Sequence, residues 1–187
     1  MYKNCVTEQS IRRQRALEAG LLDAMLNGGY ESISISELCD GLEIPRKSFY
    51  RYFNGKEGAL YALIDHNIEE LVEDLESEDD TQLTMENFFA GWLERRRFLD
   101  AIVRNELVDI FVWRGLKKAM DTDMVSEKLM SLHAGLRREY VVMFIVSGLL
   151  SLVFQWHKDG FAESPREMGS ISMHLVTRPI FSVMLPK

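Results

Sequence analysis

The fold is decided by residues 34–56, which read SISELCDGLEIPRKSFYRYFNGK. Ser34 and Glu37 have the spacing of a capping box, in which the hydroxyl accepts an exposed backbone N–H and the carboxylate reaches back to the N–H of the capping residue. We expect a short helix from Ile35 to Gly41. Pro45 can begin a second helix, because its missing N–H would have no partner at that position. The stretch therefore predicts two short helices joined by a tight turn.

The second of these helices, residues 46–53, separates an apolar side from a polar one. A repeat of 3.6 residues per turn directs Phe49 and Phe53 toward the rest of the protein. The side chains left to face outward are Arg46, Lys47, Ser48, Tyr50 and Arg51. Arginine can bridge O6 and N7 of guanine, whereas lysine and tyrosine suit phosphates. The pair is typical of the helix-turn-helix, which places its second helix in the major groove of DNA.

The charge distribution agrees with that interpretation, although the net charge is −7. Residues 1–60 hold eight Lys and Arg against eight Asp and Glu, so the remaining residues, with fourteen against twenty-one, carry the whole negative excess. Residues 46–56 contain four basic side chains and no acidic one. Lys56 begins the next helix, where its amine and the exposed N–H groups are expected to hold one phosphate. This local patch is what a phosphate backbone would meet.

The rest of the chain has the pattern of long helices separated by short breaks. An apolar stripe from Glu8 to Asn27 predicts the first helix, which Gly28 and Gly29 close. Further helices are expected at residues 56–75, 84–95, 97–118, 123–134, 137–159 and 166–184. Alternation typical of strands occurs only at residues 32–36, a stretch too short for a sheet and already explained by the helix cap. The predicted fold class is all-α.

One stretch, residues 140–157, has no Asp, Glu, Lys or Arg and approaches the length of a membrane span. We interpret it as a buried helix of a soluble protein, because it contains Gln155 and the other predicted helices are amphipathic. It is apolar on nearly every side, so one side can pack within the chain while another needs a partner. We expect a dimer interface formed by Ser147, Gly148, Ser151 and Gln155. The alternative is that Gly148 permits a close contact within the chain.

A set of aromatic and sulfur-containing side chains forms a candidate pocket for a small hydrophobic effector. The set is Phe88, Phe89, Trp92, Phe111, Trp113, Met143 and Phe144. Such side chains at helical spacing also form ordinary cores, and that alternative stays open. The histidines lack metal-binding spacing, and the sequence contains no Gly-rich phosphate loop or nucleophile elbow. We therefore expect no metal site, no cofactor and no enzymatic activity.

Residues 15–64 resemble the DNA-binding domain of the TetR family of transcriptional regulators. The resemblance rests on the Gly-Gly-Tyr corner at residues 28–30, the Ser34 cap and the run SFYRYFNGKEGAL at residues 48–60. It implies backbone contacts by Tyr50, Tyr52 and Lys56 and groove-facing positions for Arg46, Lys47 and Arg51. Ser34 and Ser36 complete the predicted DNA-binding set. Two positions depart from the family, which usually has Ala where Cys39 stands and Gly where Glu43 stands.

Residues 147–168 resemble, more loosely, the penultimate helix and following corner of many TetR-family members. The resemblance implies that this helix and the last one form the dimer's four-helix interface, and that a pocket lies among the middle helices. We expect a helix-turn-helix domain of three helices at residues 1–55, followed by a larger helical domain for effector binding and dimerisation at residues 56–187.

The function expected from these observations is a ligand-responsive dimeric regulator, most simply a repressor, that binds a palindromic operator. Control by a protein partner, or the absence of any effector, is the alternative, and a helical enzyme is the least favoured. The two cysteines, Cys5 and Cys39, have no CxxC spacing, which fits a reduced cytoplasmic compartment. No secretory signal and no membrane association are expected.

Overall fold

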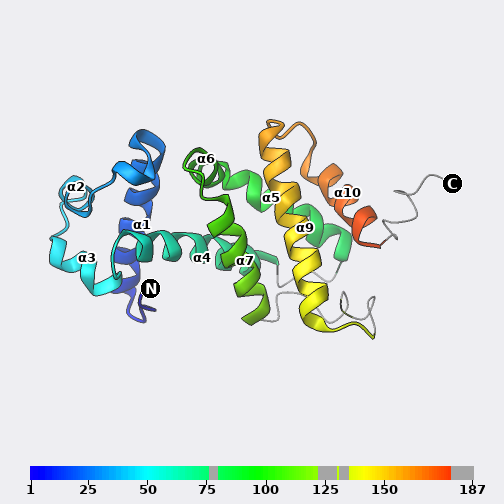
Figure 1. Cartoon of the computed structure of the whole chain (residues 1–187), viewed down its shortest axis with the longest axis horizontal. Coiled ribbons are helices and arrows are strands. Elements are labelled where there is room, and N and C mark those ends of the chain that lie inside the picture. The colour runs from blue at the N-terminus through cyan, green and yellow to red at the C-terminus, as the bar shows by residue number, and fades with distance from the viewer. Residues whose placement is uncertain (76–79, 122–129, 131–134, 178–187) are drawn as a thin grey trace. The chain divides into compact units, whose positions relative to one another are not determined.

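The computed structural model describes residues 1–75, 80–121, 130 and 135–177, and most of them are helical (Figure 1). The helices are α1 (Glu8–Gly28), the 3₁₀ helix η1 (Tyr30–Ser32), α2 (Ile35–Gly41), α3 (Arg46–Tyr52), α4 (Lys56–Leu75), α5 (Thr81–Glu94), α6 (Arg96–Arg104), α7 (Val108–Asp121), α9 (Arg138–Lys158) and α10 (Pro165–Thr177). The prediction of an all-α protein is confirmed. The predicted helix at 123–134 lies outside the described residues except for Met130, as does the end of the predicted last helix.

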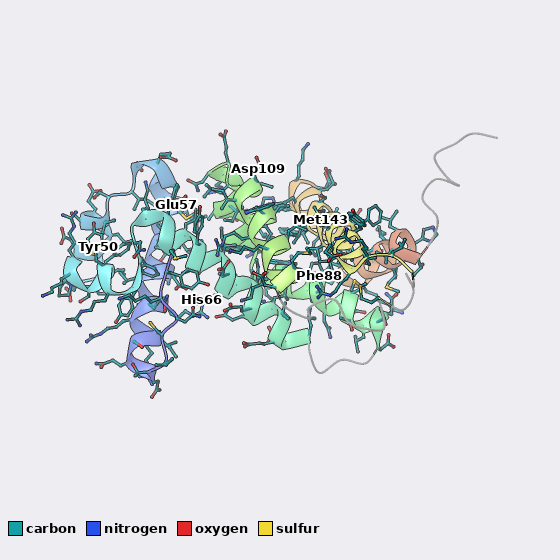
Figure 2. The ribbon with its side chains drawn as sticks, turned by 60° about the horizontal axis from the view of Figure 1, so that its bottom comes forward. Tyr50, Glu57, His66, Phe88, Asp109 and Met143 are labelled. Carbon is teal, nitrogen blue, oxygen red and sulfur yellow. The ribbon has the colours of Figure 1, made fainter. Side chains whose placement is uncertain are left out.

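The helices form two compact units. The first comprises Met1–Glu69 and Asp100–Arg114, and the second comprises Glu70–Leu99 and Gly115–Lys187. The first unit extends beyond residue 55 because α4, which carries His66 (labelled in Figure 2), packs against α1. The Nδ1 atom of His66 lies 2.9 Å from a carboxylate oxygen of the buried Glu18. The division by function at residues 55 and 56 stays a prediction.

The core of the first unit is built on α1. Thr7 caps this helix by accepting the Ser10 N–H at 3.3 Å, and the apolar stripe predicted from the sequence buries Leu17, Leu21 and Met25. Helix α1 passes close to the turn after α2, because a Cβ on Gly20 would lie 2.6 Å from Leu42 Cδ1. Fully burying a Leu or Met side chain, as α1 does, contributes about 1.5–3 kcal/mol to the stability of the folded protein.

The single helix predicted at 97–118 is wrong, since the chain forms α6 and α7 instead. Glu106 adopts φ 57, in the left-handed region, and the Leu107 N–H turns back to the Ile102 carbonyl at 3.0 Å. Asn105 supplies the reason, because its amide donates to the Met25 carbonyl at 3.3 Å and accepts the Tyr30 N–H. The break is fixed by a contact with α1 and the corner after it.

The second unit places α5 and α10 side by side. A Cβ on Gly169 would lie 3.0 Å from the Glu86 backbone nitrogen, so this glycine permits the close approach. Phe89 of α5 meets the buried Trp156 of α9 edge-on, with ring centroids 5.6 Å apart, and Trp156 Nε1 donates to the Glu163 carbonyl at 2.9 Å. The core therefore includes aromatic side chains from α5 and α9.

Helix α9 is long and apolar enough, by length and composition, to cross a membrane. In the folded chain 39% of its most apolar window is buried. Core helices of soluble proteins pass the same test, so the helix alone is weak evidence for a membrane span.

Candidate nucleic-acid interface

Helix α2 begins at the cap predicted from the sequence. Ser34 Oγ accepts the Glu37 N–H at 3.1 Å, as expected for a capping box. The Glu37 carboxylate accepts the Ser34 hydroxyl at 2.7 Å, which is the contact the structure gives in place of the expected one with the Ser34 N–H. Ser34 is exposed and Ser36 half-buried beside it. The cap fixes where α2 starts, and Ser34 is already engaged in it.

The turn between α2 and α3 contains one backbone conformation that favours glycine. Glu43 adopts φ 53, and its N–H donates to the Asp40 carbonyl at 3.1 Å. The Ile44 N–H donates to the carbonyl of the buried Cys39 at 2.9 Å and closes the turn. A residue with a Cβ in this region costs about 1 kcal/mol relative to Gly. The departure noted at Glu43 therefore has a structural cost, whereas Cys39 fits the core.

Helix α3 begins at Arg46, as predicted, with Pro45 as its N-cap at φ −56 and ψ 131, and it ends at Tyr52, one residue before the predicted end. Phe49 and Phe53 are fully buried, with ring centroids 5.0 Å apart, and Tyr52 is buried beside them. The exposed residues of the helix are Arg46, Lys47, Tyr50 and Arg51, while Ser48 is half-buried. Tyr50 is 48% exposed and projects from the helix (Figure 2). The aromatic side thus fixes which side of α3 is offered to a partner.

The exposed side of α3 is cationic. Arg46 Nη2 donates to the Tyr50 hydroxyl at 3.4 Å, and that hydrogen bond, together with the charge interaction, raises the pKa of Arg46. Among the described residues, no carboxylate forms an ion pair with Arg46, Lys47 or Arg51. Guanidinium and ammonium groups that lack a carboxylate partner can donate hydrogen bonds to phosphate oxygens and to O6 and N7 of guanine.

Lys56 has a role that the sequence did not reveal. Its ammonium donates to the Tyr30 carbonyl at 2.7 Å and to the Glu31 carbonyl at 3.1 Å, and it lies 4.5 Å from the centroid of the Tyr30 ring. An ammonium has three donors, so one is left for a phosphate. Lys56 therefore ties the start of α4 to η1, whatever it contributes to DNA.

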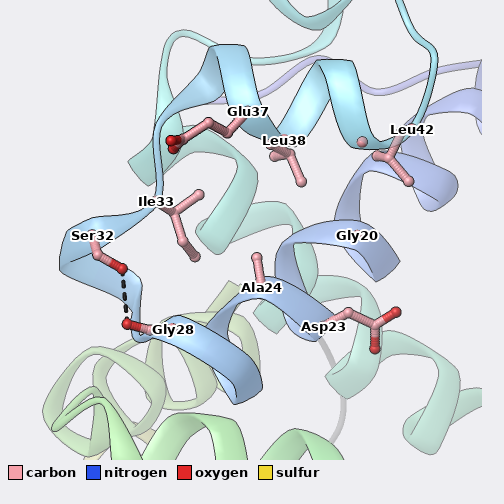
Figure 3. Close-up of a pocket in the computed structure, with 10 residues that line it drawn as sticks. Gly20, Asp23, Ala24, Gly28, Ser32, Ile33, Glu37, Leu38 and Leu42 are labelled. Carbon is pink, nitrogen blue, oxygen red and sulfur yellow. Dashed lines mark hydrogen bonds between the residues drawn. The ribbon is translucent and has the colours of Figure 1, made fainter.

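Two cavities in the first unit are lined by none of the residues of the predicted effector pocket. One, of about 400 Å³, lies between α1 and α2 and is lined in part by Gly20, Ala24 and Leu38 (Figure 3). Another, of about 310 Å³, is lined by Tyr30, Asn105 and their neighbours. Neither includes a residue of the predicted pocket set.

The predicted pocket residues do not share one environment. Phe89, Trp92 and Phe111 are buried, Phe88 is half-buried, and Trp113, Met143 and Phe144 are exposed. Phe111 and Trp113 belong to the first unit and the other five to the second. Within the second unit Phe88 contacts Phe89 and Trp92, with ring centroids 5.2 and 6.3 Å apart. The α5 members therefore form one aromatic cluster.

The predicted interface residues of α9 lie along its exposed side. Gly148, Ser151 and Gln155 are exposed and Ser147 is half-buried. No described atom outside the helix's own backbone and the neighbours of Gly148 lies within 4 Å of the place where a Gly148 Cβ would stand. The alternative of a tight intrachain contact at Gly148 is therefore wrong for the described residues.

Comparison with known proteins gives one short match in sequence. No family model matches the chain. The HTH-type dhaKLM operon transcriptional activator DhaS of Lactococcus lactis subsp. lactis (strain IL1403) is 30% identical over 67 residues. The match spans 36% of this chain and only 36% of that protein.

Solved structures match most of the chain. The dihydroxyacetone kinase operon activator DhaS gives a TM-score of 0.64 at 16% identity, over 89% of this chain and 94% of that one. A TetR transcriptional regulator from Streptococcus agalactiae 2603V gives 0.68 at 12% identity, over 91% and 96%. FadR from Bacillus subtilis, solved in complex with stearoyl-CoA, gives 0.58 at 14% identity, over 87% and 97%. At these identities the likeness shows the fold.

The first prediction concerns Lys56. Lys56→Met should lower the free energy of unfolding by about 1.5 kcal/mol, because two carbonyls of η1 lose a charged donor. Chemical denaturation measures the change. Lys47→Met is the matched control, since Lys47 is exposed, and it should leave stability within about 0.5 kcal/mol of the unmodified protein. Equal free energies of unfolding for the two variants would show that the Lys56 contacts do not stabilise the protein.

Proposed function

We propose that this chain, which has the fold of the TetR-family transcriptional regulators, is a dimeric DNA-binding regulator that responds to a small apolar effector. The observation that carries the proposal is the cationic exposed side of α3, held outward by the burial of Phe49 and Phe53. Such a helix at the end of a helix-turn-helix has the dimensions to enter a major groove. The structural neighbours are regulators and not enzymes, in agreement with the expectation of no enzymatic activity.

The proposed DNA contacts divide by chemistry. Arg46 and Lys47, in the first turn of α3, are proposed to reach base edges, because the N-terminal residues of a recognition helix make such contacts. Arg51 is also proposed to face the groove, where it can reach a base or an adjacent phosphate, and Tyr50 is proposed to contact the backbone. Ser34, Ser36, Ser48, Tyr52 and Lys56 remain proposed contacts of the backbone or its surroundings. Tyr52 is buried, so it offers less surface than Tyr50 does.

The proposed dimer uses the exposed side of α9. Apolar side chains follow the same side toward the start of the helix: Tyr140 is 63% exposed, Met143 47% and Phe144 63%. Ile171 and Leu175 of α10 are exposed as well. An apolar stripe of this extent on a regulator is typical of a subunit interface, and the open space at Gly148 allows a second helix to approach. A two-fold dimer presents two α3 helices to a palindrome.

The direction of regulation is proposed to be repression, because a dimer seated on an operator can obstruct transcription. DhaS is described as an activator, so the fold is compatible with either sign. A protein of this kind acts where the DNA is, and we propose a cytoplasmic location.

The second prediction tests the DNA contacts. Affinity for a duplex obtained by selection should fall steeply with salt, because Lys and Arg displace counterions from phosphates. Arg46→Ala or Lys47→Ala should weaken binding about ten- to a hundredfold and relax preference at one base pair. Fluorescence anisotropy measures both effects. Lys117→Ala, which removes an exposed charge from α7, is the control. Equal losses from Lys117→Ala and the α3 variants would contradict the assignment.

The third prediction tests the dimer. Gly148→Leu should weaken self-association and operator binding together by about tenfold or more, because a bulky side chain keeps the two α9 helices apart. Sedimentation at micromolar concentration measures the first effect. Glu94→Leu adds the same side chain at an exposed site on α5 and should dimerise normally. A monomeric unmodified protein, or a Gly148→Leu variant that dimerises normally, would show that the interface is elsewhere.

The fourth prediction concerns the effector. The half-buried Phe88, beside Phe89 and Trp92, is the proposed entry to an apolar site in the second unit. An apolar ligand is proposed because FadR from Bacillus subtilis, which has a similar fold, was solved in complex with stearoyl-CoA. An apolar ligand should change tryptophan emission and lower operator affinity by about five- to a hundredfold. Trp113→Phe removes the most exposed tryptophan, so that the remaining emission comes from the buried Trp92 and Trp156. If neither signal responds to a broad panel of apolar compounds, control by a protein partner replaces this proposal.

A further inference from the structure

The first three residues, which we call the N-terminal strap, lie against the end of α3. The Lys3 N–H donates to the Tyr52 carbonyl at 2.9 Å, and the Asn54 N–H donates to the Met1 carbonyl at 3.1 Å. These bonds pair Tyr2 with Phe53 as an antiparallel bridge. Because the strap bonds residues on both sides of Phe53, it holds the point where α3 ends.

The strap is closely fitted to its surroundings. The Gln14 side chain donates to the Lys3 carbonyl at 3.1 Å from α1. On the side of α4, a Cβ on Gly58 would lie 2.7 Å from the Met1 carbonyl oxygen, so a glycine is needed there. The contact is with backbone, which cannot turn away as a long side chain would. The strap is therefore seated on α1 and α4 as well as on α3.

Tyr2 adds a side-chain anchor on α4. Its hydroxyl donates to Asp65 Oδ2 at 2.7 Å, and its ring meets the His66 ring edge-on at 5.4 Å. Asp65 is buried. Burial, and then the hydrogen bond with Asp65, raise the pKa of Tyr2, so the hydroxyl keeps its proton and donates at neutral pH.

The same carboxylate is the partner of Arg114 on α7. Arg114 Nε donates to Asp65 Oδ1 at 2.5 Å, and Nη2 donates to Oδ2, the oxygen that also accepts Tyr2. The guanidinium lies 4.3 Å from the centroid of the Tyr61 ring. A buried carboxylate needs such donors. Because Arg114 and Tyr2 donate to the same carboxylate, a change at Arg114 also affects the hydrogen bond between Tyr2 and Asp65. Asp65 thus joins the strap to α7.

We propose that Tyr2 and Arg114 are positioning residues of the DNA interface, which act through Asp65 to hold the end of α3 in its seat. The proposal rests on the proposed function and adds a regulatory link to it. Helix α7 continues past Arg114, and its residues from Gly115 belong to the second unit. Any event that withdraws Arg114 loosens the strap and lowers DNA affinity, and by reciprocity DNA binding favours the paired state of Arg114.

Operator affinity tests the proposal in the full-length protein. Tyr2→Phe, which keeps the ring, and Arg114→Met should each weaken operator binding about five- to tenfold. The double variant should have the same operator affinity as the single variant that binds more weakly. Neither variant should change the slope of the logarithm of the association constant against the logarithm of the salt concentration. Arg51→Ala should reduce the magnitude of that slope by about one. Arg114→Lys should recover part of the loss, since an ammonium can also donate to Asp65. Lys117→Met is the charge-matched control on α7.

Hydrogen exchange tests the link without DNA. Exchange at the Asn54 amide, which donates to Met1, should accelerate about tenfold in Arg114→Met relative to Lys117→Met, while the Ile44 amide in the α2–α3 turn should not. Unchanged exchange at Asn54, or unchanged affinity of a folded Tyr2→Phe variant, would overturn the proposal. An unmodified protein that binds no duplex would instead overturn the proposed function, and the exchange result would still decide whether Arg114 controls the seat of α3.

Discussion

The burial of Phe49 and Phe53 orients helix α3 and with it the exposed cationic side of the first unit. Helix α3 spans Arg46–Tyr52, too short to be stable alone, because isolated helices below about 12 residues are marginal in water. Each buried ring contributes about 1.5–3 kcal/mol, and together they fix the rotation of the helix about its axis. That rotation decides that Arg46, Lys47 and Arg51 face outward. The outward orientation of the side chains proposed to contact DNA therefore follows from an apolar contact.

Polar contacts then fix the position of the first unit's corners. Lys56 donates to the Tyr30 and Glu31 carbonyls of η1, and Asn105 accepts the N–H of Tyr30, the first residue of the same segment. Asp65 joins the strap to α7, because its carboxylate accepts hydrogen bonds from Tyr2 and from Arg114. Hydrogen bonds to buried or half-buried groups are directional, and leaving one unmade costs more than making it gains. The apolar core stabilises this unit, while these bonds select one arrangement of its helices.

Features with local signals could be predicted from the sequence. The Ser34 cap, the α1 stripe and the two faces of α3 each depend on residues a few positions apart. The break after Asn105 could not, because its cause is a corner 75 positions away in the chain and no Gly or Pro marks it. The anchoring roles of Tyr2 and Lys56 were hidden for the same reason. Helical spacing also gives buried and exposed aromatic side chains the same pattern, so it could not distinguish the buried Trp92 from the exposed Trp113.

The central proposal is that the exposed side of α3 reads DNA in a two-fold arrangement. Selection of random duplexes by the full-length protein at low salt tests it most directly. We expect enrichment of a palindrome whose half-sites are centred about one helical turn of DNA, or a multiple of it, apart. A folded protein that enriches no duplex, or that enriches duplexes without any repeated half-site, would contradict it.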